Sequence, residues 1–395
     1  MRGRLVRKTW EANPALYAPA RYRRACSYEA FIPDPFSGLG PSLPGEVAGV
    51  VSEAEKAIVD LNRTGGPELA PLARLLLRTE SIASSKVEGL QVDARTLARA
   101  EANQDTGGRV GPEAAEILAN IDAMQLAIEQ ASAAEAVAVS AIVEVHRTLM
   151  TGAPNREVAG HVRDSQNWIG GNDYNPCGAD FVPPPPEEID GLLEDLAGFC
   201  NGETLPPLVQ AALAHAQFET IHPFADGNGR TGRALVQVIL RRRGLAPGFV
   251  PPVSVILARE KGRYIGGLTL FREDRISEWL EMFAVAARQA SDLAIRYVAR
   301  VAELQQEWRS RLDKTSRPRS DAVAWAIIDA LPAHPVVTVP VAVAATKRTK
   351  PAVTNGIEEL ERAGVLHRLG ESARNRAWEA DGLLDLIVDL EAGVG

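Results

Sequence analysis

A chain of 395 residues, 46% of them hydrophobic, is long enough for two or three domains with their own cores, and its formal net charge of −8 excludes a general basic surface for nucleic acid or anionic membranes. No apolar run follows the basic start of the chain or approaches the about 18 residues of a membrane helix, so we expect no signal peptide, no membrane span and a cytoplasmic protein. The cysteines, Cys26, Cys177 and Cys200, are odd in number and lack Cys-x-x-Cys spacing, which indicates neither a disulfide framework nor a zinc site.

The first 45 or so residues combine prolines with several aromatic side chains. The prolines argue against helix, and the aromatic content is higher than disordered segments carry, so an irregular arm packed on the body is predicted. From Pro44 onward, apolar residues recur at helical spacing. Residues 1–105 are therefore predicted to form the first unit, an arm followed by helices.

A helix is also predicted within residues 81–89, where Ser84 and Glu88 lie one turn apart on one face and Gly89 is placed to end the helix. A carboxylate near the C-terminal end of a helix opposes the helix dipole unless a cation faces it. From the residues alone, Glu88 is interpreted as an exposed carboxylate without a partner.

Two more helices are predicted between residues 112 and 150, and His146 on the second is interpreted as a core histidine. Helical periodicity then disappears until Pro186. Within this stretch Arg163 fits either a structural or a phosphate-binding role. An apolar pair and a Gly-Gly turn signal favour a short β-hairpin, although a packed Ω-type loop fits the same residues, Trp168, Ile169, Gly170 and Gly171.

The segment from His222 to Arg233 lies between two stretches of helix-period apolar residues and is predicted to be a loop between two helices. Pro223 disfavours helical geometry at His222, which leaves the imidazole at the rim, where it can act as a general base near neutral pH. Glycines on both sides of Asn228 allow left-handed backbone and so a nest of N–H groups for an anion.

Charged groups complete this segment. Asp226 can hold Mg²⁺ that bridges phosphate oxygens, since Mg²⁺ prefers one or two carboxylates together with phosphate and water. Arg230 opens the second helix, whose free N–H groups and positive dipole end face the same point. Arg233 lies one turn further on, within reach of more phosphate oxygens. A base, a metal carboxylate, an anion nest and two guanidiniums in one short loop indicate chemistry on a phosphate compound.

A long helix is predicted from Ile276 to Leu312, so the second unit spans residues 106–312 and is followed by a linker containing Pro318. Residues 318–395 show a helix, a helix-turn-helix pattern and a hairpin-like alternation, an arrangement that resembles a winged-helix domain. Basic residues there could meet DNA phosphates, but glutamates load the candidate recognition helix. DNA binding and a protein-contact or dimer module therefore both stay open.

The string from His222 to Arg233 resembles the motif of the Fic family, His-Pro-Phe-x-Asp/Glu-Gly-Asn-Gly-Arg-x-x-Arg, at every defined position. The resemblance implies a mainly α fold, with a Fic-type helical bundle core and a short β-hairpin flap, to which the C-terminal winged-helix-like domain is added. Members of the family are mostly adenylyltransferases, which move AMP from ATP onto a protein hydroxyl. The implied substrates are Mg²⁺-bound ATP and a Ser, Thr or Tyr hydroxyl of a protein target.

The resemblance also implies roles for individual residues. His222 takes the proton of the target hydroxyl, and Asp226 holds the metal. The phosphates are bound by the remaining motif residues, Gly227, Asn228, Gly229, Arg230 and Arg233. This division suits phosphoryl-type transfer, in which positioning and electrostatics supply most of the catalysis.

Three further segments resemble family features. Ser84-x-x-x-Glu88-Gly89 resembles an inhibitory motif, which implies that Glu88 pairs with Arg233 and prevents the nucleotide from seating its γ-phosphate. Tyr264 matches the first tyrosine of a Tyr-Tyr-x-x-Leu segment near the adenine, although the second tyrosine is Ile265 here. The hairpin flap borders the active site in the family, which implies a target-docking edge at Trp168, Ile169, Gly170 and Gly171.

The sequence leaves several alternatives. Glu88 could position a water for removal of AMP, which would make the enzyme bifunctional, and the donor could be another phosphate compound. In a different class, the chain could be a transcriptional regulator that senses nucleotide in its core and binds DNA through residues 318–395. The target protein, the releasing signal and a homodimer are not decided by the sequence.

Overall fold

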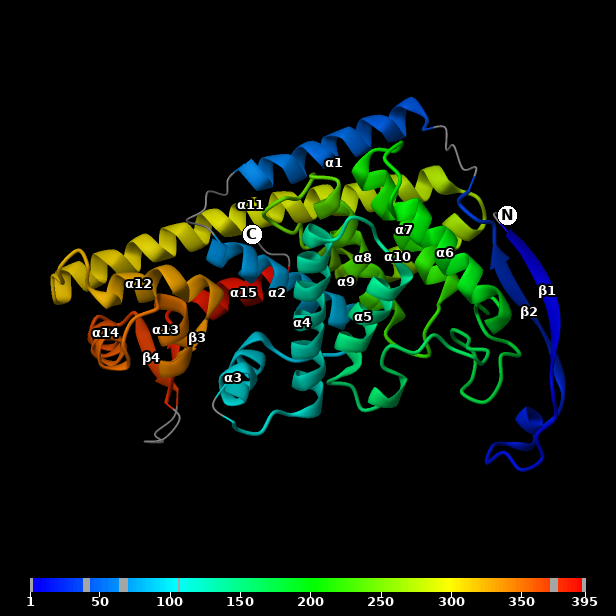
Figure 1. Ribbon diagram of the computed structural model, residues 1–395, viewed down its shortest axis with the longest axis horizontal. Coiled ribbons are helices and arrows are strands. Elements are labelled where there is room, and N and C mark those ends of the chain that lie inside the picture. Colours follow the sequence, from blue (N-terminus) through cyan, green and yellow to red (C-terminus); the bar gives the residue numbers. More distant parts are fainter. Residues whose placement is uncertain (1–2, 38–42, 64–69, 106, 370–375, 393–395) are drawn as a thin grey trace.

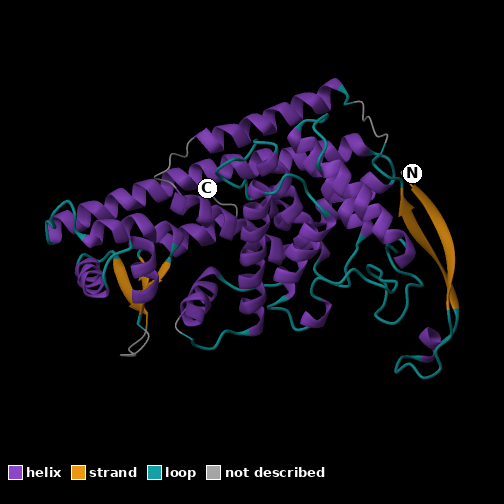
Figure 2. Cartoon of the chain, in the orientation of Figure 1, coloured by secondary structure: helices purple, strands orange, loops and turns teal. Residues whose placement is uncertain are grey.

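The computed structural model describes residues 3–37, 43–63, 70–105, 107–369 and 376–392. Across these residues the protein is mainly helical, with two small antiparallel sheets at opposite ends of the molecule (Figures 1 and 2). The mainly α fold class expected from the sequence is therefore confirmed.

Two strands, β1 (Gly3–Trp10) and β2 (Cys26–Pro33), form an antiparallel hairpin at one end of the molecule (Figure 1). The last residues of β2 are buried against the body, where Phe31 donates its backbone N–H to the carbonyl of Val182 at 2.9 Å. The irregular arm expected here is thus wrong. The aromatic and β-branched residues are strand formers, while Pro14 and Pro19 lie in the connecting loop and Pro33 lies at the end of β2.

The helices that build the core enclose α7, which is buried on every side from Leu208 to Ile221. Helices α7 and α8 are the two that were predicted on either side of the motif loop, and they pack against each other. The core helices are α4 (Pro112–Ala133), α5 (Val139–Met150), α6 (Ile189–Cys200), α7 (Pro207–Ile221), α8 (Asn228–Arg242), α9 (Val253–Arg259) and α10 (Lys261–Arg272). Short 3₁₀ turns span Ala20–Arg23, Arg156–Val158, Pro186–Glu188 and Leu331–Ala333.

Three N-terminal helices and one long helix surround this core. α1 (Gly45–Arg63) lies along α11 (Ile276–Thr315), the longest helix in Figure 1. α2 (Ala70–Val87) packs against α4, α8 and α9, and it brings the segment of Ser84 and Glu88 to the motif. α3 (Ala94–Asp105) packs against α4.

The C-terminal elements surround a three-stranded antiparallel sheet of order β3-β5-β4. Their apolar core is continuous with Leu72, Leu75 and Leu76 of α2 and with Trp308 of α11. The C-terminal elements are therefore packed directly onto the N-terminal helices. They are α12 (Val323–Ala330), β3 (Val336–Thr338), α13 (Val339–Thr346), α14 (Lys350–Arg362), β4 (Leu366–Leu369), β5 (Ala377–Ala380) and α15 (Leu383–Ala392). The centre of the hairpin pattern, around Gly370, lies outside the described residues.

The predicted flap hairpin contains one isolated bridge, between Ile169 and Phe181, and no extended ladder. Gly170 and Gly171 both have positive φ, 74° and 78°. The side chain of Asn172 accepts hydrogen bonds from the backbone of the two residues at 174 and 175, which folds the chain into a compact loop. The Ω-type loop is thus the better of the two descriptions.

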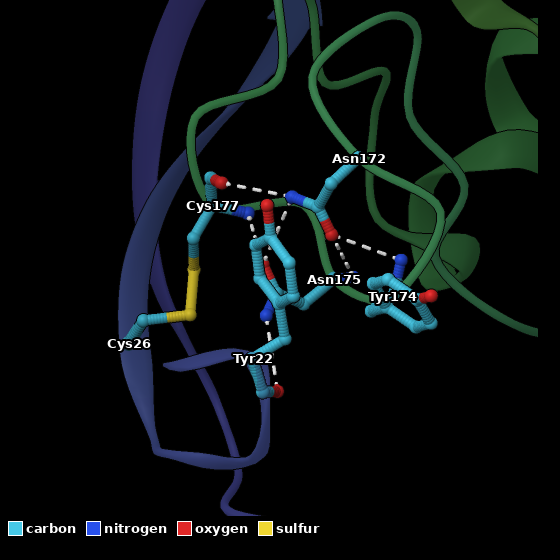
Figure 3. Close-up of a disulfide and its surroundings, with 6 residues drawn as sticks. All are labelled: Tyr22, Cys26, Asn172, Tyr174, Asn175 and Cys177. Carbon is cyan, nitrogen blue, oxygen red and sulfur yellow. Dashed lines mark hydrogen bonds between the residues drawn. A yellow bond between two sulfur atoms is a disulfide. The ribbon is translucent and has the colours of Figure 1, made fainter. Parts of the chain in front are cut away.

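A disulfide joins Cys26, at the start of β2, to Cys177 in the flap loop (Figure 3). The expectation of no disulfide is therefore wrong, because the two partners are 151 residues apart and only the fold brings them together. Cys200 is the odd residue and is buried as a free thiol. Among the described helices, none is both long and apolar enough to span a membrane.

Candidate active site

The motif loop turns sharply between α7 and α8. His222 ends α7 in a left-handed conformation, with φ 50° and ψ 59°, and Gly227 precedes α8 with φ 74°. Asn228 closes the loop, since its side chain accepts from the N–H of Phe224 at 2.9 Å and donates to the carbonyl of Phe224 at 2.8 Å. The Asn228 side chain thus holds the loop backbone, while its own N–H lies at the open end of α8.

Two buried side chains support this loop from below. Arg163 donates to the carbonyls of His222 at 2.8 Å and of Pro184 at 2.6 Å, so it ties the motif to the flap through backbone oxygens. His146 contacts the carbonyl of Asp226 through Nε2 at 3.0 Å, and its ring stacks on Phe224 at 3.7 Å. Arg163 therefore has the structural role, and His146 is a core histidine as the sequence indicated.

His222 lies at the rim, with 19% of its side chain exposed. Burial and then the nearby charge of Arg163 lower the pKa of His222 to about 4, although the backbone of Glu219 and the charges of Glu88 and Asp226 oppose this shift. The imidazole is therefore neutral near pH 7 and able to accept a proton.

Asp226 is the most exposed acidic group of the loop, with 49% of its side chain accessible. Its carboxylate accepts from the Asn155 side chain at 3.0 Å and from the N–H of Gly227 at 2.6 Å, which leaves lone pairs facing solvent. Within the described ranges, no cluster of three or more His, Cys, Asp or Glu side chains could hold a metal. One carboxylate suits Mg²⁺ only when phosphate oxygens and water complete its shell, so Asp226 fits a nucleotide-bound Mg²⁺.

Arg230 is buried and donates from Nη1 to Glu116 of α4 at 2.7 Å, while its Nη2 lies 4.0 Å from Asp226. Glu116 was not singled out in the sequence, because a carboxylate on the exposed-looking first turns of a helix carries no local signal. The ion pair fixes Arg230, the first arginine of the motif, beside Asp226.

Arg233 is buried and is held by the segment at the end of α2. It donates to the hydroxyl of Ser84 at 2.8 Å, to the Ser84 carbonyl at 2.9 Å and to Oε1 of Glu88 at 2.6 Å. Burial opposes ionisation of Glu88, but the charge and hydrogen bond of Arg233, together with the charges of Arg230 and His222, lower its pKa. Gly89 follows with φ 95° and ends the segment. The structure thus brings together the residues of the two separate motifs.

Gly229 is helical, not left-handed as the sequence suggested. A Cβ at this position would overlap Oε1 of Glu88, so the glycine provides space for the carboxylate. The left-handed turn is supplied by Gly227 and by His222 itself.

Tyr264 lies in the core beside Arg233, with 4% of the residue exposed, and its hydroxyl is 2.9 Å from Nε2 of His215. In this state its ring faces the helical core, so it is placed to support Arg233 and His215 and not to stack on a base. Its expected contact with adenine stays a prediction.

The flap residues lie between the motif and the hairpin. Ile169 is 39% exposed, and the Trp168 indole donates to the carbonyl of Asn172 at 2.6 Å and lies edge-on to Trp10 at 5.6 Å. A Cβ on Gly170 would overlap Asp180. The flap is thus braced by the N-terminal hairpin, and the Ile169 side chain is its accessible apolar point.

Several known proteins are similar to this chain in sequence or in fold. Residues 136–240 match the Fic/DOC family domain, and residues 49–129 match the Fic/DOC family N-terminal region. The chain is 29% identical over 212 residues to the protein adenylyltransferase Fic of Drosophila erecta, which covers 52% of this chain and 40% of the relative. It is 35% identical over 118 residues to the protein adenylyltransferase fic-1 of Caenorhabditis elegans, 29% of this chain and 21% of the relative.

The chain therefore spans less than half the length of these curated relatives. A crystal structure of a Fic family protein from Desulfovibrio desulfuricans G20 shares the fold, with a TM-score of 0.52 and 22% identity over 87% of this chain and 98% of that one. This chain therefore contains a Fic/DOC family domain at residues 136–240, preceded by a Fic/DOC family N-terminal region at residues 49–129.

Proposed function

We propose that the protein is an adenylyltransferase that moves AMP from ATP to a Ser, Thr or Tyr hydroxyl of a protein target and is held inactive by Glu88. The observation that carries the proposal is the ion pair of Glu88 with Arg233 at 2.6 Å, beside a neutral rim imidazole at His222. The names of the related proteins support the same reaction class.

In the proposed reaction, the target hydroxyl oxygen forms a bond to the α-phosphorus of ATP while the bond from that phosphorus to the bridging oxygen of the leaving pyrophosphate breaks. Nε2 of His222 takes the hydroxyl proton. The N–H groups at the start of α8 and the guanidiniums of Arg230 and Arg233 bind phosphate oxygens. Asp226 would hold a Mg²⁺ ion, which when bound neutralises charge on the phosphates.

The proposed inhibition follows from the charge of Arg233. While Glu88 and Ser84 occupy Nε and Nη2 of the Arg233 guanidinium, these donors are not available to a γ-phosphate, and the Glu88 carboxylate repels the same anion. Replacement of Glu88 by Gly should release the donors without adding a side chain.

The test is transfer of label from α-labelled ATP with Mg²⁺ in Glu88→Gly protein, alone and combined with His222→Ala. We expect labelling of the chain itself or of an added lysate in the single variant, and at least about a hundredfold less in the double variant. His334→Ala, which changes a histidine on the C-terminal elements, serves as the matched control and should label like its parent. Equal labelling with and without His222 would refute the proposed base.

A bifunctional enzyme is the alternative within the same scaffold. There Glu88 would also position a water to remove AMP from a modified target. Intact mass spectrometry of a modified target incubated with wild-type protein or Glu88→Gly separates the two cases, since only the bifunctional enzyme loses AMP removal with Glu88. A thermal-shift screen of other nucleotides tests the choice of ATP as donor.

The C-terminal elements favour a second candidate function, a winged-helix module. Helix, strand, two helices and a strand pair around one small sheet have the order of that module. Exposed basic residues lie in the turn between α13 and α14, Lys347 and Arg348, and at the first residue of α14, Lys350. Exposed Glu358 and Glu361 on α14 oppose DNA binding. Because the module shares its core with α2, the full chain should be tested for DNA binding with a salt series, and ultracentrifugation should test a homodimer.

The cytoplasmic location expected from the sequence stays a prediction. The disulfide of Cys26 and Cys177 favours an oxidising compartment instead. Fractionation of the source cells decides between them.

A further inference from the structure

Two buried polar atoms beside the motif loop, one on His222 and one on Glu219, have no hydrogen-bond partner. Nδ1 of His222 and Oε1 of Glu219 are buried and make no hydrogen bond, and Oε2 of Glu219 lies 4.0 Å from Nδ1 of His222. Glu219 is 8% exposed and precedes His222 by three residues, so the last turn of α7 places both side chains on one side. Burial of an unpaired carboxyl is costly, which calls for a partner in another state of the site.

The groups around Glu219 come from three other elements. Arg233 of α8 and Arg272 of α10 favour its charged form, Glu88 after α2 disfavours it, and burial raises the pKa of Glu219 to about 7. Within the described residues, no arginine forms an ion pair with Glu219. The Glu219 carboxyl therefore lies near Arg233 and Arg272 without forming an ion pair with either.

The groups around His222 make a carboxylate useful. Burial and the charge of Arg163 lower the pKa of His222, while Glu88 and Asp226 raise it. The main-chain carbonyl of Glu219 also faces the imidazole ring. A base that becomes a buried imidazolium gains from a carboxylate on the nitrogen that does not react, because that contact fixes the tautomer and balances the new charge.

We propose that Glu219 is the positioning residue of His222: its carboxylate accepts a hydrogen bond from Nδ1–H, which leaves Nε2 free to take the proton of the target hydroxyl. A movement of roughly 1 Å brings the two atoms to hydrogen-bond distance. The proton stays on Nδ1 throughout, and the proton taken by Nε2 makes the imidazolium whose charge the carboxylate balances. The catalytic half of this inference rests on the proposed function, while the tautomer and pKa of His222 do not.

The test compares full-length Glu88→Gly protein with Glu88→Gly/Glu219→Gln, both labelled with ¹⁵N-histidine. Imidazole ¹⁵N spectra between about pH 2.5 and 9, assigned with His222→Ala, report the tautomer and pKa of His222. We expect the Nδ1–H tautomer in the parent and a His222 pKa lower by about 0.5 to 1 unit in the Gln variant. The Gln variant keeps the main-chain carbonyl, so the difference isolates the carboxylate.

Kinetics provide the second readout. We expect kcat for AMP transfer to fall about tenfold or more in the Gln variant, with KM for ATP within twofold and the acid limb of the pH–rate profile moved to lower pH. Thr220→Val is the matched control, since it is buried on the same turn and bonds only to its own helix; it should change neither readout. Glu219→Asp keeps the charge and should fall between parent and Gln variant, and it replaces the Gln variant if that one does not fold.

Two results would overturn the inference. One is a His222 pKa, tautomer and kcat that are the same in parent and Gln variant. The other is an Nε2–H tautomer in the parent. If the parent transfers no AMP at all, the proposed function fails, but the ¹⁵N titration still decides the role of Glu219.

Discussion

Glu88 fills the space that a side chain on Gly229 would need: its carboxylate lies where the Cβ of residue 229 would begin. Nη1 of Arg233 lies 3.0 Å from the same point. Gly229 therefore leaves room for an acidic residue that lies 141 positions earlier in the chain. The closed state, in which Glu88 pairs with Arg233, therefore depends on the motif loop as much as on α2.

This relationship predicts the effect of Gly229→Ala. In wild-type protein, the methyl group should displace Glu88 and lower the free energy of unfolding by about 1 to 3 kcal/mol. In Glu88→Gly protein the cost should shrink, because Ala is favoured over Gly inside a helix by about 0.5 to 1 kcal/mol. Urea unfolding of the four proteins measures the coupling.

The control for this cycle is Gly191→Ala on α6, where a Cβ would meet nothing within 4 Å. It should have the same small effect in both backgrounds. Equal destabilisation by Gly229→Ala with and without Glu88 would contradict the proposed contact.

Ser84→Ala should weaken the hold of Ser84 and Glu88 on Arg233, but less than loss of Glu88 does. The hydroxyl accepts from Nε of Arg233 at 2.8 Å, and its removal leaves that donor unsatisfied in the closed state at a cost of about 1 to 3 kcal/mol. ATP affinity, measured by calorimetry in a His222→Ala background that prevents turnover, should rise, but less than with Glu88→Gly. Ser85→Ala is the control, because the Ser85 hydroxyl bonds to Ser81 and Asn120 and not to Arg233. Weaker ATP binding by Ser84→Ala would contradict the proposed effect.

Glu80 predicts a dependence of stability on pH. It is buried on α2 and accepts from the N–H and the hydroxyl of Ser254 at 2.8 and 2.6 Å, yet burial raises its pKa to about 7. Since the folded protein favours the neutral form, this stabilisation is complete below the unfolded pKa of about 4.5 and is lost as pH rises through 7.

The corresponding experiment is urea unfolding of Glu80→Gln and wild type at pH 5 and pH 8. Glutamine keeps an acceptor for Ser254 but does not ionise, so the variant should gain on the order of 2 kcal/mol relative to wild type between the two pH values. Exposed Glu129→Gln should show no such gain. A difference that is the same at both pH values would mean that Glu80 does not titrate on unfolding.

The disulfide predicts how the hairpin is held. Under denaturing, non-reducing conditions the chain should show one free thiol, that of Cys200, and three after reduction. Cys177→Ser should increase hydrogen exchange near the Cys26 end of the hairpin while the helical core stays protected, because that end is then held to the flap loop by noncovalent contacts alone, among them the Tyr22–Tyr174 ring stack (Figure 3) and the Trp10–Trp168 contact.

Cys200→Ala is the control for this experiment, since it changes a buried core thiol on α6 and leaves the hairpin attached. Three free thiols in the oxidised chain would show that Cys26 and Cys177 are not joined.

The sequence by itself determined the helices and the motif loop. Helical periodicity placed α7 and α8, because buried helix faces repeat every three to four residues. The chemistry of the loop was visible because its base, its carboxylate and its two arginines all lie within a segment of a dozen residues, where local geometry alone brings them together.

Tertiary structure decided what pairs with these groups. Two partners of the motif are remote in the chain, Glu116 on Arg230 and Arg163 on the His222 carbonyl, and so are the two ends of the disulfide, Cys26 and Cys177. Their residue types are common and carry no periodic signal, so their positions follow only from the packing of α2, α4 and the flap against α8. The helical backbone of Gly229 and the core position of Tyr264 were settled in the same way, since the space around a residue depends on its neighbours in the fold and not on its neighbours in the sequence.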